Sequence, residues 1–251
     1  MSDDRQFSFT LDDLAREALQ YGCSLGERQL QQFDRYRTLL AEWNRVINLT
    51  AISDSSEVLV KHFLDSLSIG RFIMSGDYSG LLDDAGLLDV GSGAGLPGIA
   101  FKIAFPELPV VLCDSLKKRV NFLEAVIADL QLTGIRALHG RAEELAKDQR
   151  FAGRFPLVAA RAVARFSVVA EWCIPFVSLD GYFLALKGPT VQDEVAESSR
   201  ALRILNCSVK EVMVSELPLN MGTRSVVVVH KDGPTPSRFP RKPGEASRNP
   251  L

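Results

Sequence analysis

The sequence has few of the residues that build metal and redox sites. Its four cysteines lie far apart without a C-x-x-C pair, and its three histidines are scattered. No H-E-x-x-H motif or aspartate-rich loop occurs, so the sequence predicts no metal site. No segment approaches the roughly 18 uncharged apolar residues of a membrane-spanning helix, and the acidic start MSDDRQFSFT is unlike a signal peptide. We therefore expect buried, reduced thiols and a cytoplasmic protein.

A strong excess of charge of either sign is also missing. The 251 residues include 29 Lys and Arg against 31 Asp and Glu, a net charge of −2. A uniformly basic protein that coats nucleic acid is therefore excluded. The net charge rises along the chain, from −4 over residues 1–80 and −2 over 81–150 to +1 over 151–232 and +3 over 233–251. A local basic surface is compatible with this distribution.

What the sequence does contain is the pattern of an α/β protein. Residues 1–75 predict a helical cap, because apolar residues recur at helical spacing and a further helix is expected at 57–69. Residues 76–232 alternate short apolar runs with amphipathic helices, and residues 233–251 form a basic, proline-rich tail that should be neither helix nor central strand. We predict a mostly parallel seven-stranded sheet whose last two strands form an antiparallel edge hairpin. The predicted strands are 87–90, 110–113, 135–139, 157–160, 182–187, 208–214 and 225–230.

The strongest local signal is the segment LLDVGSGAGLPGIA, in which a strand ends at residues 89 and 90 and glycines lead into a helix. Glycines at such a turn let the backbone approach a ligand, and the free amides at the helix start attract negative charge. A nucleotide-like ligand is predicted. Gly93, Gly95 and Gly98 also match the G-x-G-x-x-G fingerprint of dinucleotide-binding proteins, with Asp114 where a ribose-binding acid is expected.

Asp89 distinguishes the two candidate cofactors. It lies two residues before the first glycine, Gly91, where a carboxylate would repel a pyrophosphate but could bind an ammonium group. S-adenosylmethionine (SAM) has no phosphate; its α-amino group suits Asp89 and its ribose diol suits Asp114. We therefore favour SAM over a dinucleotide, and a tight turn that binds no ligand is the third interpretation.

Two competing motifs are weak or missing. The G-x-S-x-G pattern at residues 22–26 is that of a hydrolase nucleophile elbow, but a helical pattern precedes it where the elbow requires a strand. The P-loop pattern G-x-x-x-x-G-K-[ST] does not occur, which excludes P-loop phosphoryl transfer.

Basic residues gather where the predicted strands end. Lys117, Lys118 and Arg119 occupy the first turn of a predicted helix, where cations oppose the helix dipole and need compensation. RNA phosphates could supply it, and so could carboxylates on a solvated face. Because ligands bind at the carboxyl edge of open α/β sheets, a polyanionic substrate is favoured. The other candidate phosphate contacts are Arg165, Lys187, Arg224, Arg241 and Lys242.

Eight segments together resemble the RsmG family, formerly called glucose-inhibited division protein B, the bacterial small-subunit ribosomal RNA guanine-N7 methyltransferases. The resemblance runs from about Trp43 to the C-terminus. The matching segments are WNRVINLTAI (43–52), KHFLDSL (61–67), DVGSGAGLPGI (89–99), DSLKKRVNFL (114–123), GRAEEL (140–145), ARAVA (160–164), LKG (186–188) and FPRKPG (239–244).

The resemblance implies the Rossmann-like fold of class I SAM-dependent methyltransferases, with SAM as cofactor. It also implies methylation of N7 of a guanosine in the 530 loop of 16S rRNA, with 16S rRNA or the small ribosomal subunit as partner. We expect a monomer that uses neither metal nor membrane. In addition to Asp89, Gly93 and Gly95 of the glycine turn, the resemblance implies cofactor positions at Gly91, Leu96, Asp114, Ser115, Leu116, Ala142, Glu143 and Arg161.

Guanine N7 carries a lone pair and no proton, so its methylation is a direct displacement that needs no general base. We therefore assign no catalytic residue, and expect the protein to act by holding N7 in line with the methyl group. His62 and Asp65, three residues apart on one helical face, either line the base pocket or form a structural pair. Two alternatives stay open: a SAM-dependent methyltransferase with another acceptor, such as other RNA, a small molecule or a protein, and a non-catalytic RNA-binding module.

Overall fold

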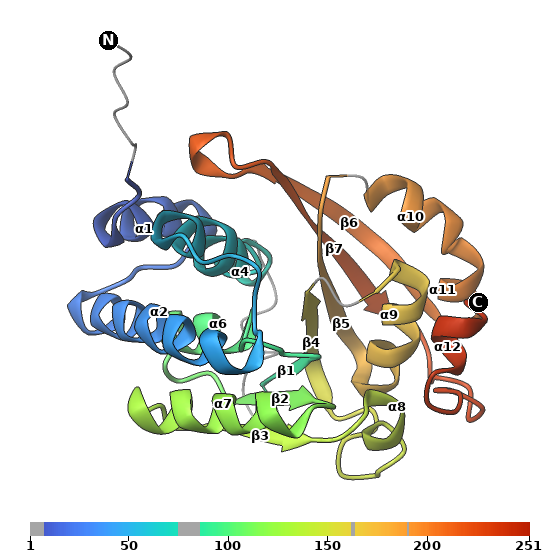
Figure 1. Cartoon of the computed structure of the whole chain (residues 1–251). Coiled ribbons are helices and arrows are strands. Elements are labelled where there is room, and N and C mark those ends of the chain that lie inside the picture. Colours follow the sequence, from blue (N-terminus) through green and yellow to red (C-terminus); the bar gives the residue numbers. More distant parts are fainter. Residues whose placement is uncertain (1–7, 75–85, 162–163, 190) are drawn as a thin grey trace.

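The computed structural model describes residues 8–74, 86–161, 164–189 and 191–251. Its centre is a seven-stranded sheet with helices on both sides (Figure 1). The strand order is β3-β2-β1-β4-β5-β7-β6, in which β1 to β5 run parallel and β7 runs antiparallel to β5 and β6. The strands are β1 (Leu87–Val90), β2 (Val110–Asp114), β3 (Ile135–His139), β4 (Phe155–Arg161), β5 (Val177–Lys187), β6 (Cys207–Glu216) and β7 (Thr223–Lys231).

All seven predicted strands are present, and the antiparallel pair at the sheet edge is confirmed. The last strand of the chain, β7, lies between β5 and β6, so β6 forms the edge. The four valines 226–229 of β7 are all buried, whereas in β6 only Cys207 is buried and Lys210, Glu211, Val214 and Glu216 are exposed. A continuous apolar run fits a strand covered on both faces, and a mixed sequence fits an edge strand.

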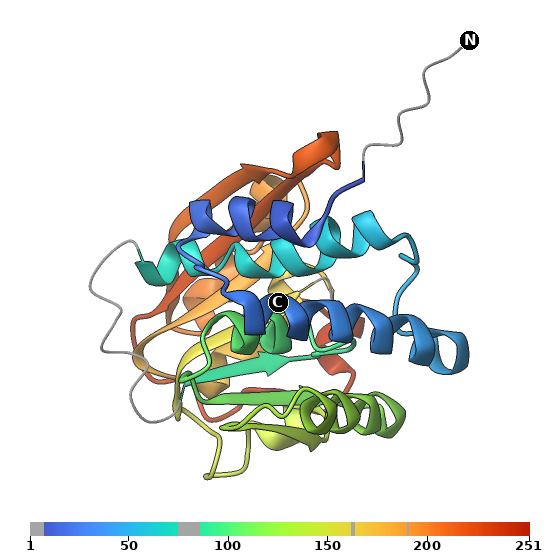
Figure 2. The ribbon, with the colours of Figure 1, turned by 90° about the vertical axis from the view of Figure 1, so that its left-hand side faces the viewer.

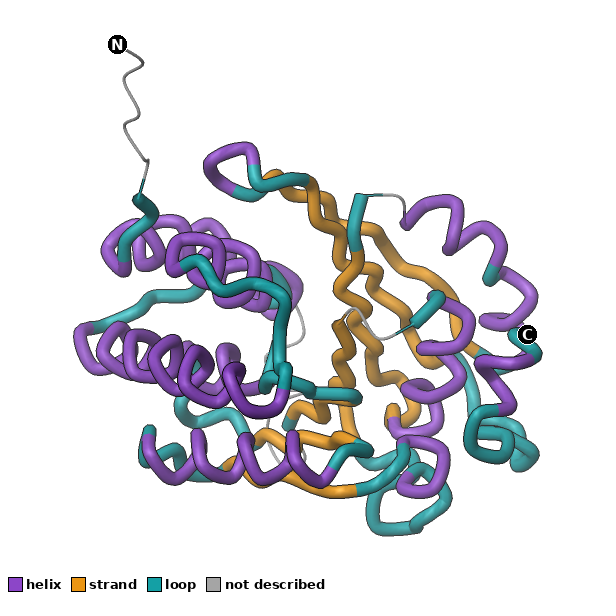
Figure 3. Tube along the Cα trace, viewed as in Figure 1, coloured by secondary structure: helices purple, strands orange, loops and turns teal. Residues whose placement is uncertain are grey.

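Helices cover both faces of the sheet and enclose two hydrophobic cores (Figure 3). Successive strand residues point to opposite faces, so Leu87 belongs to the first core and Leu88 to the second. No helix within the described ranges is long and apolar enough to span a bilayer. The first core is covered by α1 (Leu11–Ala18), α2 (Glu27–Ile47), α6 (Gly98–Ala104) and α7 (Lys117–Asp129), and the second by α8 (Ala142–Leu145), α9 (Phe166–Cys173), α10 (Val191–Glu197) and α11 (Ser199–Ile204).

The N-terminal helices share the first core with the sheet. They lie side by side across that face (Figure 2). Phe33 and Tyr36 of α2 each place their ring centroid 5.0 Å from that of Phe63, and Trp43 lies 5.6 Å from Phe122 of α7. The predicted boundary between the cap (1–75) and the following domain (76–232) falls in 75–85, outside the described residues, so the division into three parts stays a prediction.

The predicted helix at 57–69 is interrupted by a change of helix type. It begins with α3 (Ser55–Glu57), where the Asp54 side chain caps the Glu57 amide at 2.9 Å. It continues as a π-helix over Val58–Leu64 and ends in α4 (Asp65–Leu67), which α5 (Gly70–Met74) follows. Short π-helical turns occur frequently at functional sites. This one contains His62.

The C-terminal tail contains a short helix, α12 (Glu245–Arg248), so the expectation that the tail forms no helix was wrong. Its prolines at 243 and 250 lie outside these four residues and therefore do not interrupt them. Gly244 makes the turn into the helix with a φ of 78°. Phe239, 8% exposed, packs into the second core and holds the tail on the body of the protein.

Candidate active site

The glycine turn after β1 lies at the carboxyl ends of β1 and β2, where the Gly91 amide donates to the Cys113 carbonyl at 2.8 Å. Gly91, Gly93 and Gly95 have φ values of 73°, 57° and 85°, a region that favours glycine. At Gly95 a Cβ would lie 2.7 Å from the Tyr36 hydroxyl, so packing also demands glycine there. At Gly93 a Cβ would meet only the Gly91 carbonyl, at 3.7 Å. The turn is therefore open at Gly93.

Asp89 places a buried acceptor beside this turn. Its Oδ2 accepts a hydrogen bond from the Gly98 amide at 3.0 Å, whereas Oδ1 has no partner among the described residues. Burial raises the pKa of the Asp89 carboxyl to about 7. A buried acceptor without a partner is costly, and an ammonium group would both satisfy Oδ1 and favour the ionised carboxylate. Asp89 thus fits the α-amino group of SAM.

Asp114, at the end of β2, connects the glycine turn to the start of α7. Its Oδ2 accepts from the Gly93 amide at 2.9 Å and its Oδ1 from the Leu116 amide at 2.8 Å. A carboxylate has about four acceptor sites, so about two remain for the hydroxyls of a ribose. Arg119 Nη1 lies 3.5 Å from Oδ2. Asp114 therefore supplies part of the compensation that the basic first turn of α7 needs.

A cavity of about 210 Å³ lies next to Asp114. It brings together residues from β2, the turn after β3, α8, α9 and the C-terminal tail. Leu96 and Leu116, two further predicted cofactor residues, lie in the glycine turn and before α7, outside its lining. The lining includes the predicted cofactor residues Gly91, Asp114, Ser115, Ala142 and Glu143. It also includes Trp172, Gly244 and Ser247, which the sequence pattern did not single out because they come from distant segments.

Arg161, at the end of β4, joins the sheet to the π-helical turn. Its Nη1 donates to Asp65 Oδ2 and to the Lys61 carbonyl, both at 2.9 Å, and its Nη2 lies 3.1 Å from His62 Nδ1. Arg224 Nε lies 3.7 Å from the other oxygen of Asp65. His62 and Asp65 are thus linked through Arg161. A guanidinium has five N–H groups, so Nε–H and one Nη2–H have no partner within the described ranges and are available to a ligand.

His62 is uncharged in this environment. Burial and the neighbouring Arg161 guanidinium lower the pKa of its imidazole to about 4. Arg161 can only donate, so Nδ1 accepts and the proton resides on Nε2, which lies 2.7 Å from the Thr50 hydroxyl. The Lys61 carbonyl, 3.3 Å from Nδ1, would need a donor there and is the weaker partner. His62 is therefore fixed between Arg161 and Thr50.

Some of the predicted phosphate contacts form ion pairs within the protein, and others are exposed to solvent. Lys187 pairs with Glu194 at 2.8 Å, and Arg241 forms a two-pronged ion pair with Glu171, with one oxygen at 2.5 Å. These cations already neutralise carboxylates of the protein. The exposed members of the predicted set are Lys117, Lys118, Arg165 and Lys242. They are the stronger candidates for phosphate contacts.

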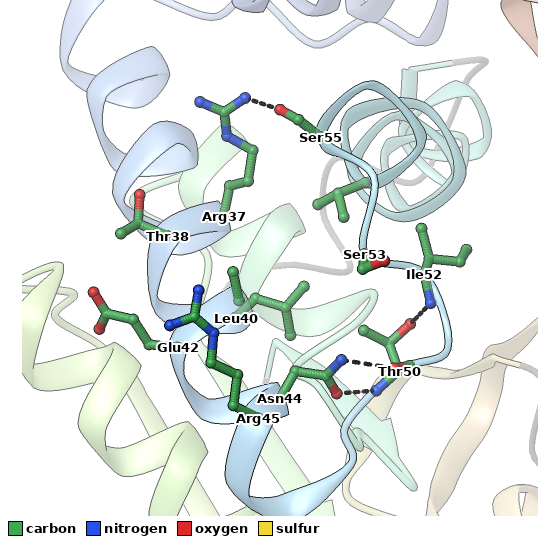
Figure 4. A pocket seen from close by; sticks show the side chains of 12 residues that line it. Arg37, Thr38, Leu40, Glu42, Asn44, Arg45, Thr50, Ile52, Ser53 and Ser55 are labelled. Carbon is green, nitrogen blue, oxygen red and sulfur yellow. Dashed lines mark hydrogen bonds between the residues drawn. The ribbon is translucent and has the colours of Figure 1, made fainter.

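A larger cleft of about 630 Å³ lies between the C-terminal half of α2 and the loop 48–55 (Figure 4). Asn44 shapes this loop by accepting from the Thr50 amide and donating to the Thr50 carbonyl, both at 2.9 Å. The exposed Arg45 contributes positive charge, whereas Arg37, hydrogen-bonded to Ser55, is paired with Asp34, and the carboxylate of Glu42 also lines the cleft. Thr50 lines the cleft and also contacts His62, so the cleft adjoins the Arg161 cluster.

Within the described ranges, no group of three or more His, Cys, Asp or Glu side chains is arranged to hold a metal ion. All four cysteines are buried and free. Burial raises the pKa of Cys23, Cys113 and Cys207 to about 12. These side chains are therefore packed thiols and not nucleophiles at neutral pH.

Comparisons with known proteins agree with this geometry. A family model described as GidB, rRNA small subunit methyltransferase G, matches residues 29–223. The ribosomal RNA small subunit methyltransferase G of Acetivibrio thermocellus is 43% identical over 231 residues, which cover 92% of each chain. Its counterpart in Exiguobacterium sp. is 44% identical over 92% of this chain and 94% of the relative.

The fold is also found among solved structures. A SAM-dependent methyltransferase from Aquifex aeolicus superposes with a TM-score of 0.51 at 17% identity, covering 73% of this chain and 97% of that one. The predicted Rossmann-like methyltransferase fold is confirmed. Because the family model spans most of the sequence and close relatives match it nearly end to end, the chain belongs to the rRNA small subunit methyltransferase G (GidB) family.

Proposed function

We propose that the protein transfers a methyl group from SAM to N7 of a guanosine in the 530 loop of 16S rRNA. The observation that carries the proposal is the buried Asp89 at the end of β1, whose Oδ1 has no partner among the described residues. It is followed by the open glycine turn, which is bonded through Gly93 to Asp114 of the cavity lining. Membership of the rRNA small subunit methyltransferase G family supports rRNA as the substrate. We further infer a monomer that works in the cytoplasm on 16S rRNA or the small subunit.

The chemistry requires positioning more than proton transfer. Bound SAM would supply a methyl group activated by its sulfonium. The lone pair of N7 would form the new C–N bond as the C–S bond breaks, S-adenosylhomocysteine would leave, and the positive charge would pass to the guanine ring. No proton has to be removed, so no general base is needed. This agrees with a site in which the imidazole of His62 is buried and bonded on both sides.

Five polar residues of the site have roles in this proposal. Asp89 binds the α-amino group, and Asp114 binds the ribose hydroxyls. The N–H groups of Arg161 that have no partner among the described residues donate to the carboxylate at the amino-acid end of SAM. Asp65 and His62 act as positioning residues, because they hold Arg161 against the π-helical turn. Fixed geometry of this kind supplies several kcal/mol by removing the entropy of alignment.

We infer that the RNA next to the target guanosine binds in the cleft between α2 and the loop 48–55 (Figure 4). The exposed Arg45 supplies a cation for a phosphate, whereas Arg37 is already paired with Asp34. The second amide N–H of Asn44 and the hydroxyl hydrogen of Thr50 supply donors for bases or riboses. The cleft adjoins the Arg161 cluster through Thr50 and His62. A single strand could therefore continue from this cleft to the cofactor.

The direct test is methylation of rRNA from a bacterial strain that lacks the enzyme. Purified protein is incubated with SAM labelled in its methyl group and either 16S rRNA or small subunits, and the product is digested and mapped by mass spectrometry. We expect one 7-methylguanosine in the 530 loop. Label at another atom, at another site, or on protein or small molecules alone would contradict the proposal. Binding of SAM and RNA without any transfer would favour a non-catalytic RNA-binding module.

A further inference from the structure

One wall of the cavity next to Asp114 comes from the end of the chain. Gly244 and Ser247 line this cavity together with Trp172 of α9 and Glu143 of α8. About 100 residues separate Glu143 from Gly244, yet the Gly244 amide donates to Glu143 Oε1 at 3.0 Å. We call residues 239–248 the wall segment. Its contact with Glu143 connects it directly to a predicted cofactor residue.

A buried ion pair anchors the wall segment. Arg241 donates from Nε to Glu171 Oε1 at 2.9 Å and from Nη2 to Oε2 at 2.5 Å, and its backbone amide donates to Oε1 at 3.0 Å. The Glu171 side chain is only 1% exposed. Phe239 and Ala246 of the wall segment are also buried, at 8% and 1% exposed, and Phe239 belongs to the second core. Fork-shaped pairing of this kind fixes direction as well as distance.

Trp172 adds a second observation that points to a ligand. It lines the cavity from α9, next to Gly244 and Ser247 of the wall segment. Aromatic rings stack well on nucleobases. The cavity therefore presents an aromatic surface next to the wall segment.

We propose that the wall segment is a built-in part of the cofactor site, which encloses the adenosine half of SAM together with Trp172 and is held in place by the Arg241–Glu171 pair. This inference rests on the proposed function, because SAM is its ligand. It gives Arg241 a role different from the RNA contact that the sequence predicted, since the charge of Arg241 is used within the protein. Lys242, the next residue, is exposed and keeps the predicted RNA contact.

The test compares Arg241→Ala with Lys242→Ala, which removes the same charge one residue away. The affinity for labelled SAM is measured by equilibrium dialysis without RNA. We expect the Arg241→Ala variant to bind SAM about tenfold more weakly or worse, because the wall is no longer pre-organised. Lys242→Ala should bind SAM as the wild type does. Limited trypsin digestion provides a second readout: SAM should protect the bonds after Arg238 and Arg248 in the wild type but not in Arg241→Ala.

Two further variants keep the test independent of folding. The double variant Arg241→Ala/Glu171→Gln removes the buried charge that Arg241→Ala leaves unpaired, and it should show the same loss of SAM affinity. Ser247→Phe places a large side chain at an exposed position of the cavity lining, and it should weaken SAM binding while the melting temperature stays near that of the wild type.

If the Arg241 variants are folded, bind SAM within twofold of the wild type and lose only affinity for rRNA, the wall segment is an RNA contact and the inference is wrong. If the wild-type protein itself binds no SAM, the proposed function fails first. The two failures are distinguished by the wild-type dialysis measurement alone.

Discussion

Asp89 is the residue on which cofactor binding should depend most strongly. It is fully buried, one of its oxygens is bonded to the Gly98 amide, and the other has no partner among the described residues. Its pKa of about 7 means that the carboxyl is partly protonated at neutral pH. An ammonium ligand binds the ionised form, so binding and proton release are linked at this residue.

This linkage predicts a pH dependence of SAM affinity. Between pH 7 and pH 6 the empty site becomes increasingly protonated at Asp89, so the affinity should fall by about fivefold. An α-amino group, with an ordinary pKa near 8, stays charged over this range. His62, with a pKa of about 4, also does not titrate there. Equilibrium dialysis at the two pH values measures the change.

The variant Asp89→Asn serves as the control for this pH dependence. It should bind SAM weakly at both pH values, with no change between them. An unaltered pH dependence in Asp89→Asn would show that another group is responsible.

The open side of the glycine turn gives a second prediction at the scale of one residue. Gly93→Leu should abolish SAM binding, because the new side chain occupies space that only the Gly91 carbonyl approaches. The matched control is Gly153→Leu. Gly153 precedes β4 and so lies at the amino end of that strand, whereas the glycine turn lies at the carboxyl ends of the strands. Gly153 has a φ of 62°, close to the 57° of Gly93, and similar free space. Both variants should lose about 1–2 kcal/mol of stability from backbone strain.

SAM dialysis and thermal unfolding separate the two effects. The control should melt at a similarly lowered temperature but bind SAM normally. If Gly93→Leu retained normal affinity, the ligand would not approach the turn from this side.

At the scale of elements, the C-terminal half of α2 connects the cap to the active site. Tyr36 donates to the Ala94 carbonyl in the glycine turn, and Trp43 packs on Phe122 of α7. Asn44 then shapes the loop that leads to Thr50 and His62. The shape of the cleft therefore depends on the contacts that hold α2 against the glycine turn and α7.

Arg45 tests whether this element binds RNA. Arg45→Ala should raise the KM for rRNA about three- to tenfold, since one phosphate contact is lost, and leave the affinity for SAM unchanged. Arg28→Ala is the control, because Arg28 is an exposed arginine roughly 25 Å away at the other end of the same helix. Methylation kinetics at fixed SAM measure both. Equal effects of the two substitutions would indicate a general charge effect without a specific cleft contact.

At the scale of the whole molecule, the net charge of −2 does not show that the basic residues fall into two groups, those paired with carboxylates of the protein and those exposed to solvent. Several of them pair with carboxylates inside the fold, as Arg161, Lys187 and Arg241 do. Among the described residues, the exposed candidates near the site are Lys117, Lys118, Arg165, Lys242 and Arg45, with Arg141 in the lining of the cavity next to Asp114. Recognition of one folded RNA site fits this distribution better than a broad electrostatic surface.

A shallow salt dependence follows from so few contacts. With three to five phosphates neutralised, a plot of log affinity for rRNA against log salt concentration should have a slope between about −2 and −4. Filter binding at several salt concentrations measures it. Lys117→Ala/Lys118→Ala should make the slope less negative by about 1 to 2. A wild-type slope steeper than about −7 would contradict this view of the interface.

Much of the fold could be predicted from local patterns. The seven strands, the antiparallel edge pair and the glycine turn follow from apolar runs, helical spacing and turn residues that lie close together in the sequence. The π-helical turn and α12 were missed, because neither has a distinctive periodicity over so few residues.

The sequence by itself determined the α/β architecture and the glycine turn after β1, because short-range geometry governs a strand and the turn that follows it. It also favoured SAM as the cofactor, with Asp89 and Asp114 as its predicted binding residues. Only the tertiary structure decided which charges are used internally. Arg161 meets Asp65 across 96 positions of the chain, and Arg241 meets Glu171 across 70. Such pairings depend on how distant segments pack against one sheet, and no local pattern of residues specifies that.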